Sequence, residues 1–125
     1  MSKKKILVID DEASLTRMLR KNLEATGKYE VKEENSGAQA YASAKQFQPD
    51  MILLDVMMPD MDGGEVAAQI QDDEHLKHIP IVFLTAIVQK EEAEDTGSNI
   101  GGRTFLAKPV KLDDLITCIE KELGK

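Results

Sequence analysis

In the segment KKKILVIDDEAS, residues Lys3–Ser14, an apolar strand pattern ends directly on a group of acids. Residues Ile6–Ile9 form the continuous aliphatic run that is typical of a strand covered on both faces. Asp10, Asp11 and Glu12 follow at once. Carboxylates so close together repel one another, so an acidic group at the end of a core strand requires a physical reason.

The rest of the chain alternates strand and helix patterns in the same way. Further strands are predicted at 29–33, 51–54, 79–84 and 104–107. Helices are predicted from apolar spacing at 15–23, 40–47, 66–70 and 112–123, with a short or mobile fourth helix at 89–95 in chain order. The glycine-rich segment 97–102 shows neither pattern. Five strand–helix units predict an α/β domain, with a parallel sheet and helices on both faces.

Composition and charge narrow the class of protein. A chain of 125 residues suits one domain, and its net charge of −7 argues against direct contact with nucleic acid. No apolar stretch approaches membrane-spanning length, and the N-terminus lacks the apolar region of a signal peptide. Cys118 is the only cysteine and cannot form an internal disulfide. We therefore expect a cytoplasmic protein that makes no membrane contact.

Polar residues follow the predicted strands at their carboxyl ends. Asp55 ends the third strand, Thr85 ends the fourth, and Lys108 follows the fifth. The carboxyl ends of parallel strands share one rim of the sheet, so these side chains should meet Asp10 and Asp11 there. Carboxylate oxygens suit Mg²⁺ or Mn²⁺ and do not suit zinc, and a bound cation would relieve the repulsion among the acids.

A carboxylate beside a metal can also act as a nucleophile. Asp55 could attack a phosphoryl group and form an acyl phosphate. The metal and Lys108 would then neutralise charge on the equatorial oxygens, and Thr85 could donate a hydrogen bond to one of them. The residues therefore favour phosphoryl chemistry at this rim.

Four segments carry a resemblance to a known family: ILVIDDE, MILLDVMMPDMDG, IVFLTA and FLAKP. With these segments in this order and at these separations, the chain resembles the receiver domain of bacterial two-component response regulators over essentially its full length. The resemblance implies a single receiver domain at 1–125. It also implies a flavodoxin-like five-stranded parallel sheet of order 2-1-3-4-5.

The resemblance implies a role for each matching residue of the metal site. Asp55 matches the aspartate that accepts the phosphoryl group and also binds the metal. Asp11 matches a direct Mg²⁺ ligand, and Asp10 matches an acid that acts largely through water. The backbone carbonyl of Met57 matches the third protein ligand.

The resemblance also implies a switch beside that site. Thr85 and Lys108 match the pair that holds the phosphoryl oxygens. Thr85 and Phe105 match the residues that move when the domain switches, with phenylalanine where tyrosine is frequent. The Lys108–Pro109 bond matches a cis peptide bond.

The partners implied are those of a phosphorelay. The phosphoryl group would come from a sensor histidine kinase, a phosphotransfer protein or a small phosphodonor. The signal would pass to a downstream effector protein or to a covalently attached output domain. The family also allows a homodimer through the fourth helix, fifth strand and fifth helix. Such a domain catalyses only its own phosphorylation and dephosphorylation and is not a turnover enzyme.

Three other functions fit parts of the pattern. An aspartate-nucleophile phosphatase would carry a second acid two residues after Asp55, where this chain has Met57. A flavin-binding protein would carry a Ser/Thr/Gly-rich phosphate loop after the first strand, where this chain has acids. An adaptor that is never phosphorylated would have no need for Asp55, Thr85 and Lys108 together.

Overall fold

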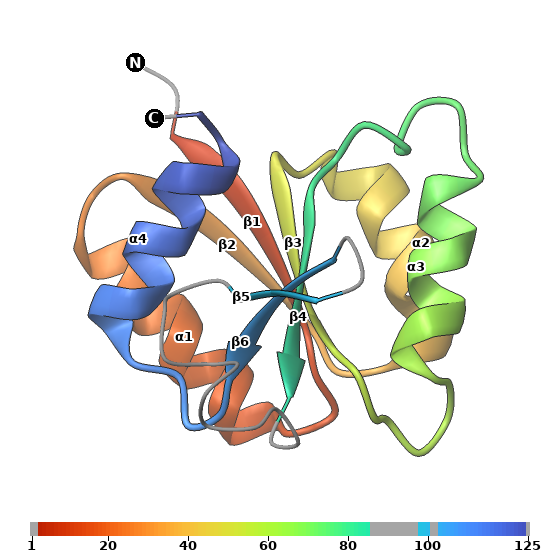
Figure 1. Ribbon diagram of the computed structural model, residues 1–125, viewed down its shortest axis with the longest axis horizontal. Helices are drawn as coiled ribbons and strands as arrows, with labels where there is room; N and C mark the ends of the chain where they lie inside the picture. The colour runs from red at the N-terminus through yellow and green to blue at the C-terminus, as the bar shows by residue number, and fades with distance from the viewer. Residues whose placement is uncertain (1–2, 86–97, 101–102, 125) are drawn as a thin grey trace.

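Strand β1 (Lys4–Ile9) is an interior strand of the sheet, and its alternate residues are buried on opposite faces. Ile6 and Val8 pack into one apolar cluster, and Leu7 and Ile9 pack into the other. In the computed structural model, which describes residues 3–85, 98–100 and 103–124, the sheet therefore forms the middle layer between two layers of helices (Figure 1).

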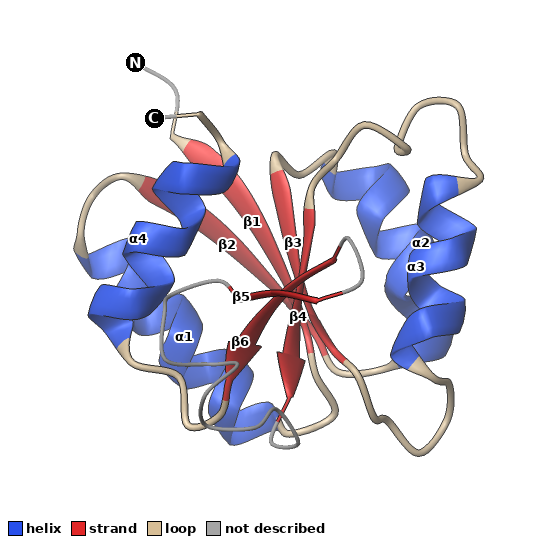
Figure 2. Ribbon diagram, viewed as in Figure 1, coloured by secondary structure: helices blue, strands red, loops and turns tan. Residues whose placement is uncertain are grey.

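Helices cover both faces of this sheet, as Figure 2 shows. On one face, α1 (Ala13–Ala25) and α4 (Leu112–Glu122) bury Leu19, Leu23, Leu115 and Ile119. On the other face, α2 (Gly37–Phe47) and α3 (Gly63–Gln71) bury small and aliphatic residues, namely Ala40, Ala44, Val66, Ala67 and Ile70. In the described part of the chain, no helix is long and apolar enough to span a membrane.

The strand order confirms the predicted topology. Five strands run parallel in the order β2 (Tyr29–Glu34), β1, β3 (Met51–Asp55), β4 (Ile81–Thr85) and β6 (Arg103–Ala107). In order of the parallel strands this is the predicted 2-1-3-4-5 arrangement. All five carboxyl ends therefore reach the same rim of the sheet, which is the lower rim in Figure 1.

A sixth strand corrects the prediction for the glycine-rich segment. β5 (Ser98–Ile100) pairs antiparallel with β6 and forms the edge of the sheet. Ile100 pairs with Arg103, so the sequence Gly-Gly alone separates the two strands. A three-residue strand is too short to show an alternating pattern, so the sequence of the segment 97–102 alone does not predict it. The predicted helix at 89–95 lies outside the described residues.

The start of α3 refines the prediction. This helix begins at Gly63, three residues before the helix that the sequence predicts at 66–70. The side chain of Asp62 accepts a hydrogen bond from the Gly64 N–H at 2.7 Å, and Glu65 reaches back to the Asp62 N–H at 3.4 Å. This capping box stabilises the first turn of α3 and fixes where the preceding loop ends.

Candidate functional site

The site lies at the carboxyl rim of the sheet, where the parallel strands end. A pocket there is lined by three residues that directly follow β1, by the last residues of β3 and β4, and by residues just beyond β3 and β6. They are Asp10, Asp11, Glu12, Asp55, Met57, Thr85 and Lys108. The structure thus brings together every residue that the sequence placed in the metal and phosphoryl site. Glu12, which the sequence did not assign to the metal or phosphoryl site, also lines the pocket.

Lys108 is the cation at the centre of this pocket. Its Nζ lies 2.8 Å from Asp10 Oδ2 and 3.2 Å from Asp55 Oδ1. Its backbone N–H donates to the Thr85 carbonyl at 2.9 Å, which extends the pairing of β4 and β6 by one residue. The main chain therefore holds Lys108 where one ammonium group can bridge two carboxylates from different strands.

Asp10 and Asp55 are held in a nearly dry environment. Asp10 is fully buried, and Asp55 is 5% exposed. Asp10 Oδ1 accepts a hydrogen bond from the Glu12 N–H at 2.9 Å, while its other oxygen contacts Lys108. Asp11 is exposed at the mouth of the pocket. The three acids therefore differ in exposure, because Asp10 and Asp55 are buried and Asp11 is exposed to solvent.

The pocket raises the pKa values of two of its groups, Asp55 and Lys108. Burial raises the pKa of Asp55, and the charge of Asp10 raises it further, against opposing contacts with Lys108 and the Met57 backbone. Burial alone would lower the pKa of Lys108, but its contacts with Asp10 and Asp55 outweigh burial and raise it. Lys108 is therefore a permanent cation, whereas the ionised form of Asp55 is electrostatically disfavoured.

The charges and donor atoms fit a divalent cation. Asp10, Asp11 and Asp55 each offer a carboxylate oxygen, and these atoms lie within 4.8 Å of one another. Lys108 supplies one positive charge against three carboxylates, so the group carries an excess of negative charge. Oxygen donors are the ligands that Mg²⁺ prefers, and Mg²⁺ commonly binds through one or two carboxylates with water.

Replacing Asp55 by asparagine is expected to raise the midpoint of thermal unfolding of the metal-free protein at neutral pH. The substitution removes a buried charge that burial and Asp10 disfavour. Because the pKa of Asp55 is raised in the folded state, the native protein binds more protons than the unfolded chain. Stability of the wild type therefore falls as pH rises through that pKa.

The advantage of Asp55→Asn should consequently shrink as the solution is acidified and Asp55 becomes protonated in the wild type. Circular dichroism melts with a chelator present, at neutral and at mildly acidic pH, measure both effects. A variant less stable than the wild type at neutral pH would contradict the electrostatic description of this pocket.

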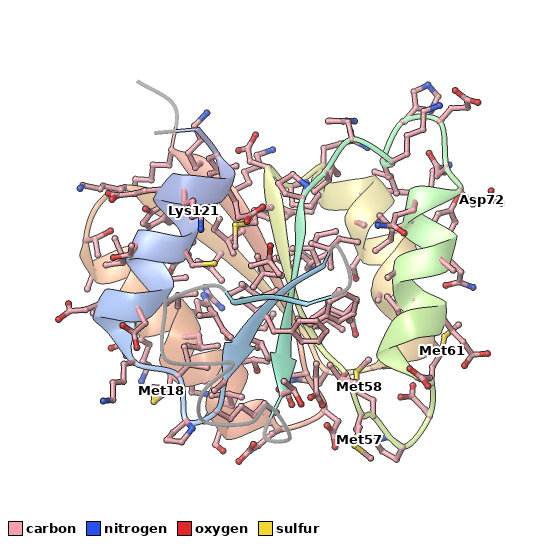
Figure 3. All side chains as sticks on the ribbon, viewed as in Figure 1. Met18, Met57, Met58, Met61, Asp72 and Lys121 are labelled. Atoms are coloured by element: carbon pink, nitrogen blue, oxygen red, sulfur yellow. The ribbon has the colours of Figure 1, made fainter. Side chains whose placement is uncertain are left out.

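The loop after β3 is pressed against the backbone of Asp55. Gly63 donates its N–H to the Val56 carbonyl at 2.9 Å. A Cβ atom at Gly63 would lie 2.3 Å from the Asp55 carbonyl oxygen and 2.9 Å from Val56 Cα. Only glycine fits this approach, so Gly63 closes the loop that carries Met57. The exposed side chain of Met57 lies at the same rim (Figure 3).

Gly63→Ala is therefore expected to lower the free energy of unfolding by about 2–3 kcal/mol, because backbone must move to admit the methyl group. Gly64→Ala is the matched control, since a Cβ there would meet only Asp62 Oδ1 at 3.4 Å. In a helix, that change should stabilise the fold by up to about 1 kcal/mol. Urea denaturation of both variants compares them, and equal effects would contradict the close approach at Gly63.

Phe105 lies apart from the pocket. Its ring stacks on that of Phe83, its neighbour in β4, with centroids 5.4 Å apart and an angle of 28° between the rings. The ring is half-buried against the cluster that α2 and α3 cover. Lys108–Pro109 is a cis peptide bond, as the resemblance implies.

Sequence reasoning missed two residues that support the acidic turn. The side-chain amide of Asn35 donates to the backbone carbonyl of Asp10 at 2.8 Å. The same amide group donates to the hydroxyl of Thr16 at 2.9 Å. No local pattern identifies such contacts, because they join residues that are distant in the sequence.

Comparison with known proteins shows which family this chain resembles. A family model described as the response regulator receiver domain matches residues 6–120. The chain is 32% identical over 121 residues to the polar-differentiation response regulator DivK of Brucella ovis, covering 97% of both chains.

Solved structures show the same fold. The chemotaxis protein CheY4 of Vibrio cholerae matches with a TM-score of 0.82 and 30% identity, over 97% of this chain and 99% of that one. The receiver domain of the sensor histidine kinase PA1611 of Pseudomonas aeruginosa matches with a TM-score of 0.82 and 27% identity, over 99% and 100%. That structure is described with a magnesium ion coordinated in the active site cleft.

Proposed function

The chain belongs to the response regulator receiver domain family, and on this premise we propose that it accepts a phosphoryl group on Asp55 in a Mg²⁺-dependent reaction. One observation carries the proposal. The Asp55 carboxylate lies 3.2 Å from the Lys108 ammonium, in a pocket where oxygens of Asp10 and Asp11 lie within 4.8 Å of it. A nucleophile, a fixed cation and an acidic metal site therefore share one space.

The metal would be held by the carboxylates of Asp10, Asp11 and Asp55 and by the backbone carbonyl of Met57, with Asp10 acting largely through water. When bound, Mg²⁺ supplies positive charge that offsets the charge of the phosphoryl oxygens. The magnesium described in the PA1611 receiver domain supports this proposal. Mn²⁺ has similar ligand preferences and could replace it.

In the transfer step, a carboxylate oxygen of Asp55 attacks the phosphorus of a phosphohistidine. The new P–O bond forms as the P–N bond breaks, and the electron pair of that bond returns to the imidazole of the donor. With acetyl phosphate as donor, a P–O bond breaks and acetate leaves. Lys108 and Thr85 hold the phosphoryl oxygens, and Lys108 remains charged throughout because its pKa is raised.

Phosphorylation would be signalled to a partner by a change in the shape of the protein surface near β6. In this proposal, Thr85 moves toward the phosphoryl group and Phe105 changes its rotamer, which requires its ring to leave the stack with Phe83. The resulting surface includes β6 and α4, and the helix predicted at 89–95 lies outside the described residues. The outer edge of β6 is already paired with β5, so a homodimer through this face would have to include β5.

The domain thus acts as a cytoplasmic switch in a two-component phosphorelay. A sensor histidine kinase or phosphotransfer protein supplies the phosphoryl group. An effector protein, or an output domain on the same chain, reads the altered surface. Regulation and not substrate turnover is the output, because the domain catalyses only its own phosphorylation and dephosphorylation.

Beryllofluoride, which mimics a phosphoryl group on a carboxylate, tests the proposal without turnover. With Mg²⁺ present, its addition should change the NMR signals of Asp55, Thr85 and Phe105 in the wild type. Asp55→Asn should show none of these changes. Equal changes in both proteins, or none in the wild type, would contradict the proposed site.

Met57 is expected to slow the loss of the phosphoryl group. Its side chain is 66% exposed at the pocket and cannot hydrogen-bond an attacking water strongly. Met57→Asn introduces an amide that can orient that water, so the lifetime of the phosphorylated protein should shorten several-fold. Ile87, two residues beyond Thr85 as Met57 is two beyond Asp55, is also apolar, and it lies outside the described residues. Decay followed after removal of the phosphodonor measures the effect, and an unchanged lifetime would refute it.

A further inference from the structure

Asn35 joins the end of β2 to the turn that carries the acids. Its Nδ2 atom donates to the Asp10 carbonyl oxygen at 2.8 Å and to Thr16 Oγ1 at 2.9 Å. A carbonyl oxygen can only accept a hydrogen bond, so the amide nitrogen is the atom that must face Asp10. Both hydrogens of the amide are therefore used, one by the Asp10 carbonyl in the turn and one by the Thr16 hydroxyl in α1.

The second partner of Asn35 is itself fixed. Thr16 is fully buried in α1, and its hydroxyl lies 3.0 Å from both the Ala13 carbonyl and Glu33 Oε1. That hydroxyl donates its hydrogen on this side and accepts the Asn35 amide on the other. Because Thr16 cannot move without disturbing the core, it anchors the Asn35 side chain in one rotamer.

The Asp10 carbonyl lies in the peptide group that joins Asp10 to Asp11. A peptide group is planar, so fixing this carbonyl also fixes the N–H and Cα of Asp11. The Asp10 carboxylate has its own anchors in Glu12 and Lys108. Among the described residues, by contrast, the exposed Asp11 carboxylate has no hydrogen bond or ion pair, so the backbone is what fixes the point from which its side chain reaches toward the other acids.

We infer that Asn35 is a positioning residue for the proposed Mg²⁺ site, because it holds the Asp10–Asp11 peptide so that the Asp11 carboxylate faces the metal. This inference rests on the proposed function. Asn35 touches neither the metal nor the phosphoryl group and acts through the backbone of the two acids. It adds the residue that directly follows β2 to a site otherwise built at the ends of β1, β3, β4 and β6.

Calorimetric titration of the unphosphorylated protein with MgCl₂ tests the inference through affinity alone. Asn35→Leu keeps the shape of the side chain and removes both donors, and it should raise the Kd for Mg²⁺ about tenfold, as loss of a group that orients a metal ligand typically does. Asn22→Leu, the same change within α1, is the control and should leave the Kd unchanged. Thermal melts establish that each variant is folded.

Asn35→Asp separates positioning from charge and keeps the test valid if Asn35→Leu does not fold. An added carboxylate near the pocket would, by long-range attraction alone, lower the Kd for Mg²⁺. Its oxygens cannot donate to the Asp10 carbonyl, however, so a positioning role predicts a higher Kd.

The outcomes distinguish this inference from the proposed function. A Kd for Asn35→Leu within twofold of the wild type, or tighter binding by Asn35→Asp, would overturn the role of Asn35 while leaving the metal site intact. If the wild type itself binds no Mg²⁺, the proposed function fails first. Weaker binding by both Asn35 variants, with Asn22→Leu unchanged, supports the positioning role.

Discussion

Replacing Lys108 by methionine is expected to slow phosphorylation of Asp55 by acetyl phosphate about 10²- to 10³-fold, the usual cost of removing one preorganised charge donor from a transition state. Lys108 Nζ lies 3.2 Å from Asp55 Oδ1 and 2.8 Å from Asp10 Oδ2, so it is already placed before any phosphoryl group arrives. Methionine keeps the length of the side chain and removes its charge. Intact-protein mass spectrometry over time, at saturating Mg²⁺, gives the rates.

The same substitution should also destabilise the protein. Asp10 is fully buried and loses the cation it contacts, which should cost roughly 3 kcal/mol. Rates must therefore be compared where urea denaturation shows Lys108→Met to be folded. Lys111→Met, at the exposed N-cap of α4, is the matched control and should react as the wild type does. Equal rates for Lys108→Met and the wild type would remove Lys108 from the proposed chemistry.

Asp11→Ala is expected to weaken Mg²⁺ binding by at least about tenfold, because it removes one of three clustered carboxylates and the one proposed as a direct ligand. Phosphorylation by acetyl phosphate at limiting Mg²⁺ should fall in parallel and recover in part at high Mg²⁺. Calorimetric titration with MgCl₂ measures the affinity, and mass spectrometry measures the recovery.

Glu12→Ala provides the control for Asp11→Ala. Glu12 is the next residue, is also exposed and lines the same pocket, so its removal changes the charge of the region by the same amount. A solvent-exposed charge outside the ligand set is screened by salt and should alter the affinity by no more than about threefold. An equal loss in both variants would mean that Asp11 contributes general charge and is not a ligand.

Most of the fold could be predicted because its signals are local. A parallel strand covered on both faces must be apolar at every position, and Ile6–Ile9 and Met51–Leu54 are. Helices on a sheet must be apolar at helical spacing, as Leu19 and Leu23 are. Once five such units alternate, the connection rules leave few topologies, and their strand ends meet at one rim.

β5 could not be found in the same way. Its three residues are too short to show an alternating pattern, and its pairing with β6 depends on a Gly-Gly connection that also fits a loop. The position of the Phe105 ring could not be predicted from the sequence either. Its stack on Phe83 follows from the register of β4 and β6, which no local pattern determines.

The supporting contacts of the site depend on tertiary structure. Asn35 and Asp10 are 25 residues apart and meet only because β1 and β2 are neighbours in register. Gly63 is required because α3 begins against the backbone of Asp55. The residue types that carry charge could therefore be predicted from the strand ends, whereas the residues that orient them could not.

Phosphorylation of Asp55 is tested by locating the phosphoryl group on the chain. The wild type and Asp55→Asn are incubated with acetyl phosphate and Mg²⁺, and the intact masses and proteolytic peptides are compared. The proposal predicts one added phosphoryl group, on the peptide that contains Asp55, in the wild type only and only with Mg²⁺ present. An unmodified wild type, or the same modification in Asp55→Asn, would contradict it.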